Sequence, residues 1–391
     1  MPRRLVLAGC GGMARRHLHG YRVLQDFEPG RLELAAVVDP DTAKRAEAVA
    51  NEAQHLLGLR PMVYGSLEDA VKYTPELELV DVVVPTAAHL PLVEIATSAG
   101  LHVLCEKPMA PTIRACRAMQ ASAERNGRLL SIAENYRRDP IARLMRALIA
   151  ASAVGEVRSV LDFLIGPRGQ GSGWKYQRIH GGPLLGMGVH NADLQLYMAG
   201  SIDRIYGQVR WREAADAPDV LMATLEFEGG AIGQWICDRA AQGPGLRQFS
   251  VVGSNGQIDL PGVRSGRRLH IHIGTDPEPI GDDDVLAMVP AFQLDDRTAR
   301  FFGGDRLARY DDGGSAADLK LIAIEMAELL DAIDTGASLE VDAEMGLTAV
   351  GLVMAAYESS EAGRPVAMSE VLDGSLSVYQ GETDRALGLC G

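Results

Sequence analysis

Short apolar runs alternate with amphipathic stretches over the first 150 residues. The apolar runs are unbroken and rich in β-branched residues, which is typical of strands covered on both faces of a parallel sheet. Strands are predicted at 5–9, 32–39, 80–86, 102–108 and 129–135, and helices at 13–25, 41–57, 89–99, 112–126 and 139–150. Because crossovers between parallel strands are right-handed, this order predicts a doubly wound α/β domain over residues 1–150.

The pattern changes after about residue 155, where strands with alternating apolar and polar positions follow one another. Such alternation is typical of an antiparallel sheet with one covered face. We expect an α+β domain over 151–391, in which EFEGGA (226–231) forms a hairpin turn and the acidic stretch 275–315 forms an irregular excursion or a lid. The helices of 317–361 are candidates to pack back near the first domain. Strands are predicted at 156–165, 204–213, 220–229, 231–239 and 246–254, and helices at 181–199, 317–335 and 343–361.

Composition narrows the class of protein. The chain has 391 residues, 47% of them apolar and 23% charged, as expected of a globular protein with two domains. Its net charge of −14 argues against a nucleic-acid partner, although it leaves room for a local basic pocket. The five cysteines form no CxxC or Cys/His cluster, so neither a metal site nor a disulfide framework is expected, and a cytoplasmic location fits. No apolar run is long enough for a membrane span, and the N-terminal run is too short for a signal peptide.

A glycine turn follows the first predicted strand. LVLAGCGGMARRH (5–17) places Gly9, Gly11 and Ala14 in a GxGxxA pattern, which is typical of a Rossmann domain that binds a dinucleotide at a helix N-terminus. Asp39 ends the second strand, where a carboxylate accepts hydrogen bonds from the ribose hydroxyls of NAD. NAD is therefore favoured, and the nearby Lys44 and Arg45 keep NADP open. The alternative is a glycine-rich turn that binds nothing.

Two further strands end in polar residues. CEKP (105–108) places Lys107 at the carboxyl end of the fourth strand, where ligands of such sheets bind and where a lysine can transfer a proton. The alternative is a solvated Glu-Lys pair before a helix-starting proline. Pro85 and His89 follow the third strand, and His89 on its own is more simply a surface residue at a helix N-terminus.

A His and an Asp lie three residues apart in LLGMGVHNAD (184–193), after the glycine pair 181–182. The spacing puts His190 and Asp193 on one face of the predicted helix. We interpret His190 as a candidate acid/base group, the alternative being a satisfied core histidine.

The motifs GxGxxA, VVVPTAAH (82–89), EKP (106–108), GGPLLGMGVHNAD (181–193) and AAYESSEAGRPVAM (355–368) occur in an order that resembles the Gfo/Idh/MocA oxidoreductases. That family is named for glucose-fructose oxidoreductase, inositol dehydrogenase and the rhizopine catabolism protein. The resemblance covers essentially the whole chain. It implies a Rossmann domain, a second domain with an open, mostly antiparallel sheet, NAD(P) as cofactor, and a sugar, cyclitol or related polyol as substrate. It also implies a homodimer or homotetramer formed through the sheet face.

The resemblance implies a role for individual residues. Lys107, between nicotinamide and substrate, and His190 carry the proton, and Asp193 matches an Asp that follows the family's His. The implied cofactor-binding set is Gly9, Gly11, Gly12, Met13, Ala14, Asp39, Pro85, Thr86, His89, Glu106 and Lys107. The substrate-binding set is Lys107, Asn135, Tyr136, Arg137, Trp174, Lys175, Tyr176, Arg178, His190 and Asp193. A surface loop with ordinary polar residues is the alternative for 171–182, and Arg138 and Asp139 are expected to be a helix-start charge and an N-cap.

Gly186 departs from the family pattern, which has an Asp four residues before the His. Three explanations compete. His190 and Lys107 suffice for proton transfer, or Gly186 makes room for a larger substrate such as a glycoside or nucleotide sugar, or hydride transfer is transient within a reaction with no net redox change. A non-catalytic NAD-binding sensor is a further alternative.

Overall fold

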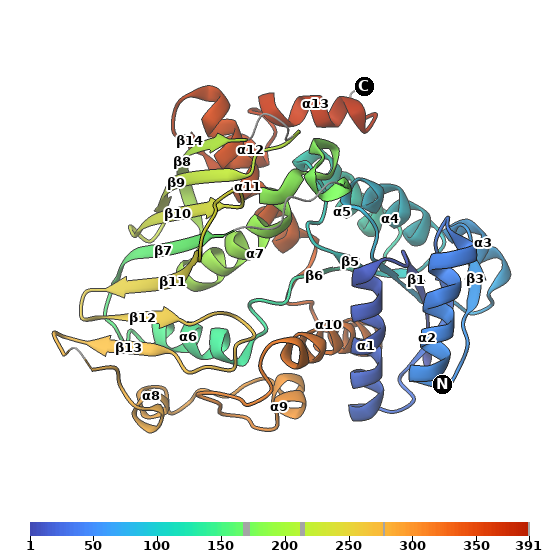
Figure 1. Cartoon of the computed structure of the whole chain (residues 1–391), viewed down its shortest axis with the longest axis horizontal. Coiled ribbons are helices and arrows are strands. Elements are labelled where there is room, and N and C mark those ends of the chain that lie inside the picture. The colour runs from blue at the N-terminus through green and yellow to red at the C-terminus, as the bar shows by residue number, and fades with distance from the viewer. Residues whose placement is uncertain (167–172, 212–215, 277, 390–391) are drawn as a thin grey trace. The chain divides into compact units, whose positions relative to one another are not determined.

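The computed structural model describes residues 1–391 except 167–172, 212–215, 277 and 390–391 (Figure 1). The end of the predicted strand 204–213 and the first two residues of the loop 171–182 lie outside the described residues. The chain divides into two compact units. Unit 1 comprises Met1–Ala110, Ala115–Asn135 and Asp318–Leu347, and unit 2 comprises Pro111–Arg114, Tyr136–Ala317 and Thr348–Gly391.

Unit 1 contains a six-stranded sheet in the order β3-β2-β1-β4-β5-β6, in which every pair is parallel (Figure 1). This is the strand order of a dinucleotide-binding Rossmann fold, so the predicted doubly wound sheet is confirmed. The sequence pattern predicted five strands, one fewer than this sheet contains. The missed strand has only three residues, of which Met62 is exposed, so it has no apolar run to reveal it. The strands are β1 (Arg3–Ala8), β2 (Leu32–Val38), β3 (Met62–Tyr64), β4 (Leu79–Val82), β5 (His102–Glu106) and β6 (Leu130–Ala133).

Helices connect these strands, and a helix from near the C-terminus joins them. The helix α10 (Ser315–Thr335) packs against α1 (Gly12–Phe27) at Gly20, where a Cβ would meet the side chain of Ile322. The other helices between the strands are η1 (Thr42–Ala46, a π-helical turn), α2 (Glu47–Leu57), α3 (Leu67–Tyr73), η2 (Thr86–Ala88), α4 (His89–Ser98) and α5 (Ile113–Arg125).

Unit 2 contains an eight-stranded sheet in the order β13-β12-β11-β7-β10-β9-β8-β14. Neighbouring strands are antiparallel except β7 and β10, which are parallel. The predicted α+β class and the hairpin turn between β9 and β10 are confirmed. The strands are β7 (Val157–Ile165), β8 (Ile202–Arg210), β9 (Val220–Phe227), β10 (Ile232–Asp238), β11 (Leu246–Gly253), β12 (Gly256–Leu260), β13 (His270–Ile273) and β14 (Val366–Ala367).

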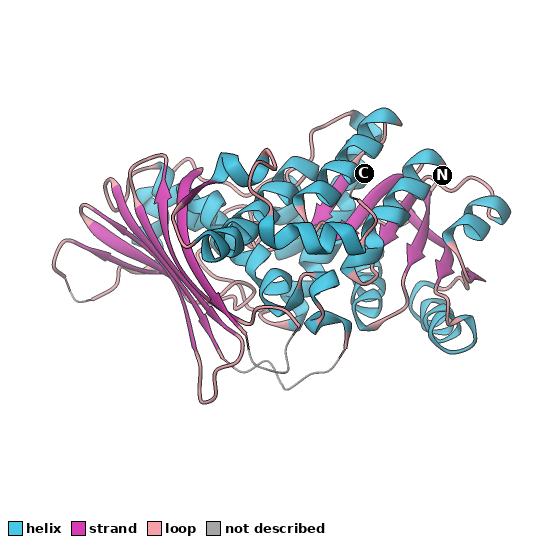
Figure 2. Cartoon of the chain, turned by 90° about the horizontal axis from the view of Figure 1, so that it is seen from above, coloured by secondary structure: helices cyan, strands magenta, loops and turns pink. Residues whose placement is uncertain are grey.

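The two faces of this sheet differ. Along β8, β9 and β10 buried and exposed residues alternate, and Figure 2 shows the sheet as a curved layer with helices on one side only. The inner face buries Trp235, and Gly188 of the helix α7 (Gly182–Ala199) lets that helix approach the Trp235 ring. The outer face exposes Tyr206, Met222 and other side chains. Assembly of copies through this face stays a prediction.

The excursion 275–315 is more ordered than predicted. It contains two short helices, α8 (Asp282–Met288) and α9 (Asp296–Phe302), between irregular stretches, so the expected irregular excursion holds in part, and a role as a lid stays a prediction. Phe301 is buried, and Phe302 packs edge-on against Tyr310 at 4.8 Å between ring centres. These aromatic side chains are therefore buried rather than solvated. The remaining helices are η3 (Trp174–Tyr176), η4 (Arg178–His180), α6 (Pro140–Ala150), α11 (Ala343–Ala362), α12 (Met368–Leu372) and α13 (Val378–Ala386).

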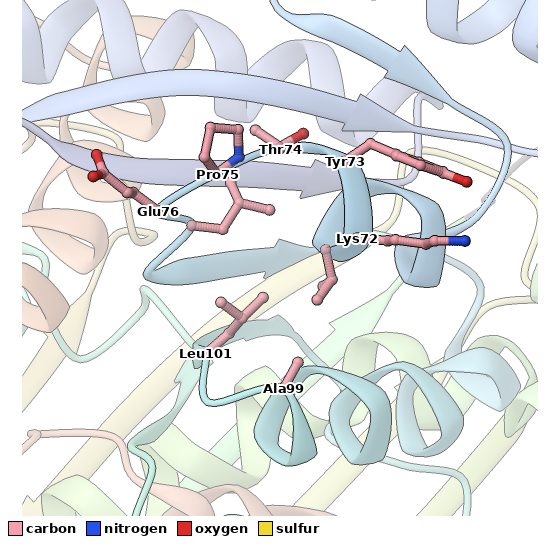
Figure 3. Close-up of a pocket in the computed structure, with 9 residues that line it drawn as sticks. Lys72, Tyr73, Thr74, Pro75, Glu76, Ala99 and Leu101 are labelled. Atoms are coloured by element: carbon pink, nitrogen blue, oxygen red, sulfur yellow. The ribbon is translucent and has the colours of Figure 1, made fainter.

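A surface hollow of about 350 Å³ lies in unit 1, lined by the end of α3 and the residues that precede β4 and β5 (Figure 3). Lys72, Glu76 and Leu101 are among its lining residues. It therefore lies at the amino ends of β4 and β5, whereas ligands of doubly wound sheets bind at the carboxyl ends of the strands. We assign no role to this hollow.

Across the described part of the chain, no helix is both long enough and apolar enough to cross a membrane.

Candidate active site

The glycine turn joins β1 to α1 at the carboxyl edge of the parallel sheet. Gly9 has φ +100°, and a Cβ there would overlap the carbonyl oxygen of Val83, so only glycine fits. Gly11 and Gly12 are exposed, and no atom lies within 4 Å of the position a Cβ would take at either residue. The backbone at the start of α1 is therefore open, and its free N–H groups suit a pyrophosphate.

Asp39 follows β2 and organises this edge of the sheet. Its Oδ2 accepts the backbone N–H of Cys10 at 3.0 Å, and its Oδ1 accepts Nε and Nη2 of Arg45 at 3.0 and 2.6 Å. Burial alone would raise the pKa of Asp39, but the hydrogen bonds from Arg45 and from two backbone N–H groups outweigh it, so the pKa is lowered. A carboxylate suits a free ribose hydroxyl and a guanidinium suits a 2′-phosphate, so the pair is compatible with both NAD and NADP.

His89 lies in the segment after β4 that also holds Pro85 and the buried Thr86. Its ring is 1% exposed, with Nδ1 at 3.1 Å from the carbonyl oxygen of Met109 and Nε2 at 3.0 Å from that of Val84. The expectation of a surface histidine is therefore wrong. Burial lowers the pKa of His89 in spite of these carbonyls. The ring links the segments that follow β4 and β5.

Glu106 is the last residue of β5, and Lys107 follows it. Glu106 is 8% exposed, and its Oε2 accepts the backbone N–H of Lys107 at 3.1 Å. The alternative of a solvated Glu-Lys pair is therefore wrong for Glu106. The side chain of Lys107 is half-buried at the carboxyl edge of the sheet.

A buried histidine behind this pair was missed in the sequence. His17 of α1 is fully buried, with Nδ1 at 2.7 Å from Asp81 Oδ2 and Nε2 at 3.0 Å from Glu106 Oε1, and Tyr21 donates its hydroxyl to Asp81. Burial opposes the charged imidazolium, but the two carboxylates prevail and the pKa of His17 is well above its usual range. The available signal was Asp81, a charged residue inside the apolar run VDVVV.

Asn135 follows β6 at the same edge and is 5% exposed. Among the described residues its Oδ1 has no hydrogen-bond partner. A buried polar atom without a partner is costly unless a ligand or water satisfies it. Together with the open glycine turn, this atom indicates that unit 1 fits a bound nucleotide.

In unit 2, the glycine pair 181–182 begins α7 with φ of +85° and +73°. His190 lies two turns later and is 6% exposed. Its ring stacks flat on Tyr136, with 4.1 Å between ring centres and 6° between planes. This stack fixes the orientation of the imidazole.

Arg137 and Asp193 form a buried ion pair. Nε and Nη2 of Arg137 lie 2.9 and 2.5 Å from the two carboxylate oxygens of Asp193, and the guanidinium carbon lies 5.0 Å from the centre of the Tyr197 ring. The sequence had placed both charged residues separately as substrate contacts. Their pairing joins α7 to the segment before α6, and direct substrate contact by either residue stays a prediction.

The loop residues predicted to bind substrate are arranged differently. Lys175 Nζ lies 5.4 Å from the Trp174 ring, and Trp174 packs edge-on against His180. Arg178 donates to the carbonyl oxygen of Tyr379 at 2.9 Å and pairs with Glu382 at 2.8 Å, so it holds α13. The role of these residues and of Tyr176 in substrate binding stays a prediction.

The segment before α6 holds the expected helix start. Asp139 caps α6 by accepting the N–H of Ile141, as predicted. Arg138, expected to be a charge at the start of this helix, directly precedes the N-cap and is fully buried. The space beside Gly186 is open. Apart from its chain neighbours and the backbone of its own helix, no atom lies within 4 Å of the position a Cβ would take. There is therefore room for an Asp side chain or for a larger ligand.

Asp162 of β7 faces α7 from the sheet. It accepts Asn191 Nδ2 at 2.6 Å and Gln195 Nε2 at 2.9 Å. Burial raises the pKa of Asp162 to about 7, although both amides and the charge of Arg247 oppose it. The unfolded carboxyl ionises near pH 4, so its contribution to stability is complete below about pH 4 and is lost as the pH rises through about 7.

Asp162→Asn is therefore expected to gain stability relative to the wild type as the pH is raised from about 5 to about 8, by roughly 1–3 kcal/mol. The reason is that Asn cannot ionise. Urea unfolding at the two pH values measures the difference, with Asp203→Asn on the exposed side of β8 as control. The same stability difference at both pH values would contradict the assignment.

Comparisons with known proteins agree with this architecture. The model of the oxidoreductase family with an NAD-binding Rossmann fold matches residues 3–134, and the GFO/IDH/MocA C-terminal domain matches 142–259. D-apiose dehydrogenase of Paraburkholderia graminis is 27% identical over 68% of this chain and 69% of its own length. A dTDP-3,4-didehydro-2,6-dideoxy-alpha-D-glucose 3-reductase of Streptomyces violaceoruber is 28% identical over 86% of this chain and 96% of its own. An NAD binding oxidoreductase of Klebsiella pneumoniae has the same fold, with a TM-score of 0.76 and 24% identity over 94% of this chain and 99% of that one.

A Rossmann unit with an open glycine turn, followed by a mixed eight-stranded sheet unit, defines an NAD(P)-dependent oxidoreductase. The chain belongs to the Gfo/Idh/MocA family, as its motifs predicted.

Proposed function

We propose that this protein oxidises a secondary alcohol of a sugar, cyclitol or sugar derivative, or reduces the corresponding ketone, with NAD in preference to NADP. The observation that carries the proposal is the open backbone at Gly11 and Gly12 beside the ionised Asp39, which fits a dinucleotide. The substrate class follows from relatives that include D-apiose dehydrogenase and a scyllo-inositol 2-dehydrogenase. The preference for NAD rests on Asp39, whose carboxylate repels a 2′-phosphate.

The proposal assigns roles to the residues of each unit. Gly9, Gly11 and Ala14 hold the pyrophosphate, and Asp39 holds the adenosine ribose. When bound, the nicotinamide supplies the hydride acceptor or donor at its C4. Lys107 and His190 hold and move the proton of the reacting hydroxyl.

The surrounding contacts keep these groups in place. Glu106 fixes the backbone at Lys107, and Tyr136 fixes the plane of the His190 ring. Asp193, paired with Arg137, fixes α7, which carries His190. Such positioning lets a proton-transfer group act without first reorganising.

The proposal is tested by incubating the purified protein with NAD or NADP and a panel of free sugars, cyclitols and glycosides. Reduced cofactor is followed by absorbance, and products by mass, in the same samples. We expect oxidised products with an equal amount of NADH. Products without accumulated NADH would instead support the reaction with no net redox change, which is the alternative raised by Gly186 in place of the family's Asp. Cofactor binding with no product from any compound would support a sensor and contradict the proposal.

A further inference from the structure

His17 connects three elements of unit 1. It lies on α1, which begins at the glycine turn, and its ring reaches β4 and β5. Its Nδ1 lies 2.7 Å from Oδ2 of Asp81 on β4, and its Nε2 lies 3.0 Å from Oε1 of Glu106 at the end of β5. One buried side chain therefore links the helix of the glycine turn to the residue that precedes Lys107.

The Glu106 carboxylate passes this contact on to Lys107. Its Oε1 faces His17, and its Oε2 accepts the backbone N–H of Lys107 at 3.1 Å. Both oxygens belong to one planar group, so a bond that fixes Oε1 also fixes the direction of Oε2. The backbone at Lys107 is therefore oriented by a contact with α1 as well as by β5.

The contact between His17 and Glu106 is charge-assisted. Burial disfavours the imidazolium, but the carboxylates of Asp81 and Glu106 outweigh it, and the pKa of His17 lies well above its usual range. His17 is therefore charged at neutral pH. A hydrogen bond with an ionised donor is about twice as strong as one between neutral groups, so it restricts the carboxylate more tightly.

Stability alone does not require this network. His17 and Asp81 are fully buried, and among the described residues Oδ1 of Asp81 has no hydrogen-bond partner. Tyr21 donates its hydroxyl to Oδ2. Apolar side chains of similar size often stabilise a buried position as well as ionised groups do, and an unpartnered buried oxygen is costly. A buried charged network beside a candidate reacting residue points to a role in the reaction.

The segment that carries Lys107 is also held on its other side. The carbonyl oxygen of Met109 lies 3.1 Å from Nδ1 of His89, whose Nε2 lies 3.0 Å from the carbonyl oxygen of Val84. His89 is buried, as His17 is. Two buried histidines thus hold the residues before and after Lys107.

We propose that His17 is a positioning residue for proton transfer, because it holds the Glu106 carboxylate in the orientation that fixes Lys107. The inference rests on the proposed function, since it concerns the same reaction. His17 is fully buried, so it acts through Glu106 rather than on the substrate. A proton-transfer group that is held in place acts without first reorganising, and a displacement of about 1 Å can lower the rate about 10²-fold.

Two amide variants separate the two contacts of the ring. The amide nitrogen of Asn lies near the position of Nδ1, and that of Gln lies near the position of Nε2. His17→Asn therefore keeps a donor toward Asp81, whereas His17→Gln keeps one toward Glu106. Both variants lose the charge. A purely structural role gives no reason for Lys107 to respond to one variant and not to the other.

Hydrogen exchange of the Lys107 N–H in the full chain, without ligand, measures the effect directly. The reference is the N–H of Ile132 on β6, which donates to the carbonyl oxygen of Val341 at 3.0 Å, so that a general loss of stability cancels. We expect exchange at Lys107 relative to Ile132 to rise at least about tenfold in His17→Asn and less than about threefold in His17→Gln. A ratio that is unchanged in His17→Asn, or equal in the two variants, overturns the proposal.

His102→Gln is the matched control. His102 is a histidine at the amino end of β5, and its Nδ1 accepts the N–H of Leu129 at 3.1 Å. The exchange ratio at Lys107 should stay within about twofold of the wild type. Both His17 variants are also prepared with Asp81→Asn, which removes one buried charge and so lowers the cost of losing the imidazolium. The same difference between them is expected there, so the comparison holds where a single variant does not fold.

Steady-state kinetics show whether His17 acts through Lys107. His17→Asn is expected to lower kcat about 10- to 100-fold, and His17→Gln less. In the Lys107→Ala background, His17→Asn should lower kcat less than about twofold further, because the residue that it positions is already gone. Equal losses in both backgrounds would show that the two residues act independently, and would overturn the proposal.

These outcomes separate the inference from the proposed function. Faster exchange at Lys107 in His17→Asn, with no product formed by the wild type from any compound, supports the link from His17 to Lys107 and removes the proposed reaction. Turnover by the wild type, with equal losses in both backgrounds, leaves the oxidoreductase function standing and removes the positioning role.

Discussion

Lys107→Ala is expected to lower kcat by about 10²–10⁴-fold while changing the dissociation constant of NADH by less than about threefold. Lys107 follows β5 at the carboxyl edge of the sheet, where its backbone is fixed by Glu106 and its side chain is half-buried. Removal of a proton-transfer group affects the chemical step, whereas the glycine turn and Asp39, which we propose to hold the cofactor, are unchanged. Steady-state kinetics and fluorescence titration with NADH measure the two quantities.

Lys72→Ala provides the matched control. Lys72 is an exposed lysine of unit 1, whose Nζ lies 4.8 Å from the Tyr73 ring at the opposite edge of the sheet. We expect its kcat to stay within about twofold of the wild type. Equal kcat values for Lys107→Ala and the wild type would remove Lys107 from the reaction. A parallel loss of NADH affinity would show that Lys107 mainly binds the cofactor.

His17→Ala is expected to lower the free energy of unfolding by about 3–5 kcal/mol near neutral pH. The imidazolium lies between Asp81 and Glu106, which are both buried. Its removal leaves the carboxylates of Asp81 and Glu106 without the imidazolium that lies between them. The pKa of His17 is raised in the folded state, so its contribution is complete below about pH 6.5 and is lost as the pH rises through the folded pKa.

His19→Ala is the control for this change. His19 lies on the same helix, its side chain is 45% exposed, and its Nε2 pairs with Glu52 at 3.1 Å. Exposed pairs contribute little, so we expect a loss below about 1 kcal/mol. Urea unfolding of both variants compares the two sites. Equal losses of stability in His17→Ala and His19→Ala would show that the buried network contributes no more than a surface contact.

The periodicity of the sequence predicted the two sheets because buried parallel strands and half-covered antiparallel strands leave different patterns. It missed β3 because three residues, one of them exposed, make no pattern. It also misjudged His89, since burial depends on which segments fold over a residue. Local sequence carries no such information.

In the candidate site too, local motifs were predictable from the sequence, whereas contacts between distant segments were not. The glycine turn and Asp39 were predictable because a helix N-terminus after a strand has a known local signature. The pairing of Arg137 with Asp193 was not, because the partners are 56 positions apart.

The central claim is that this chain moves a hydride between a substrate carbon and the cofactor. The most direct measurement uses a substrate identified in the panel, deuterated at the reacting carbon, in a single turnover with excess protein and NAD. Mass spectrometry of the recovered cofactor then shows whether it carries the label. We predict one deuterium in the NADH for each molecule of product. Product formation with an unlabelled cofactor, and with the deuterium retained on the carbon or lost to water, would contradict hydride transfer.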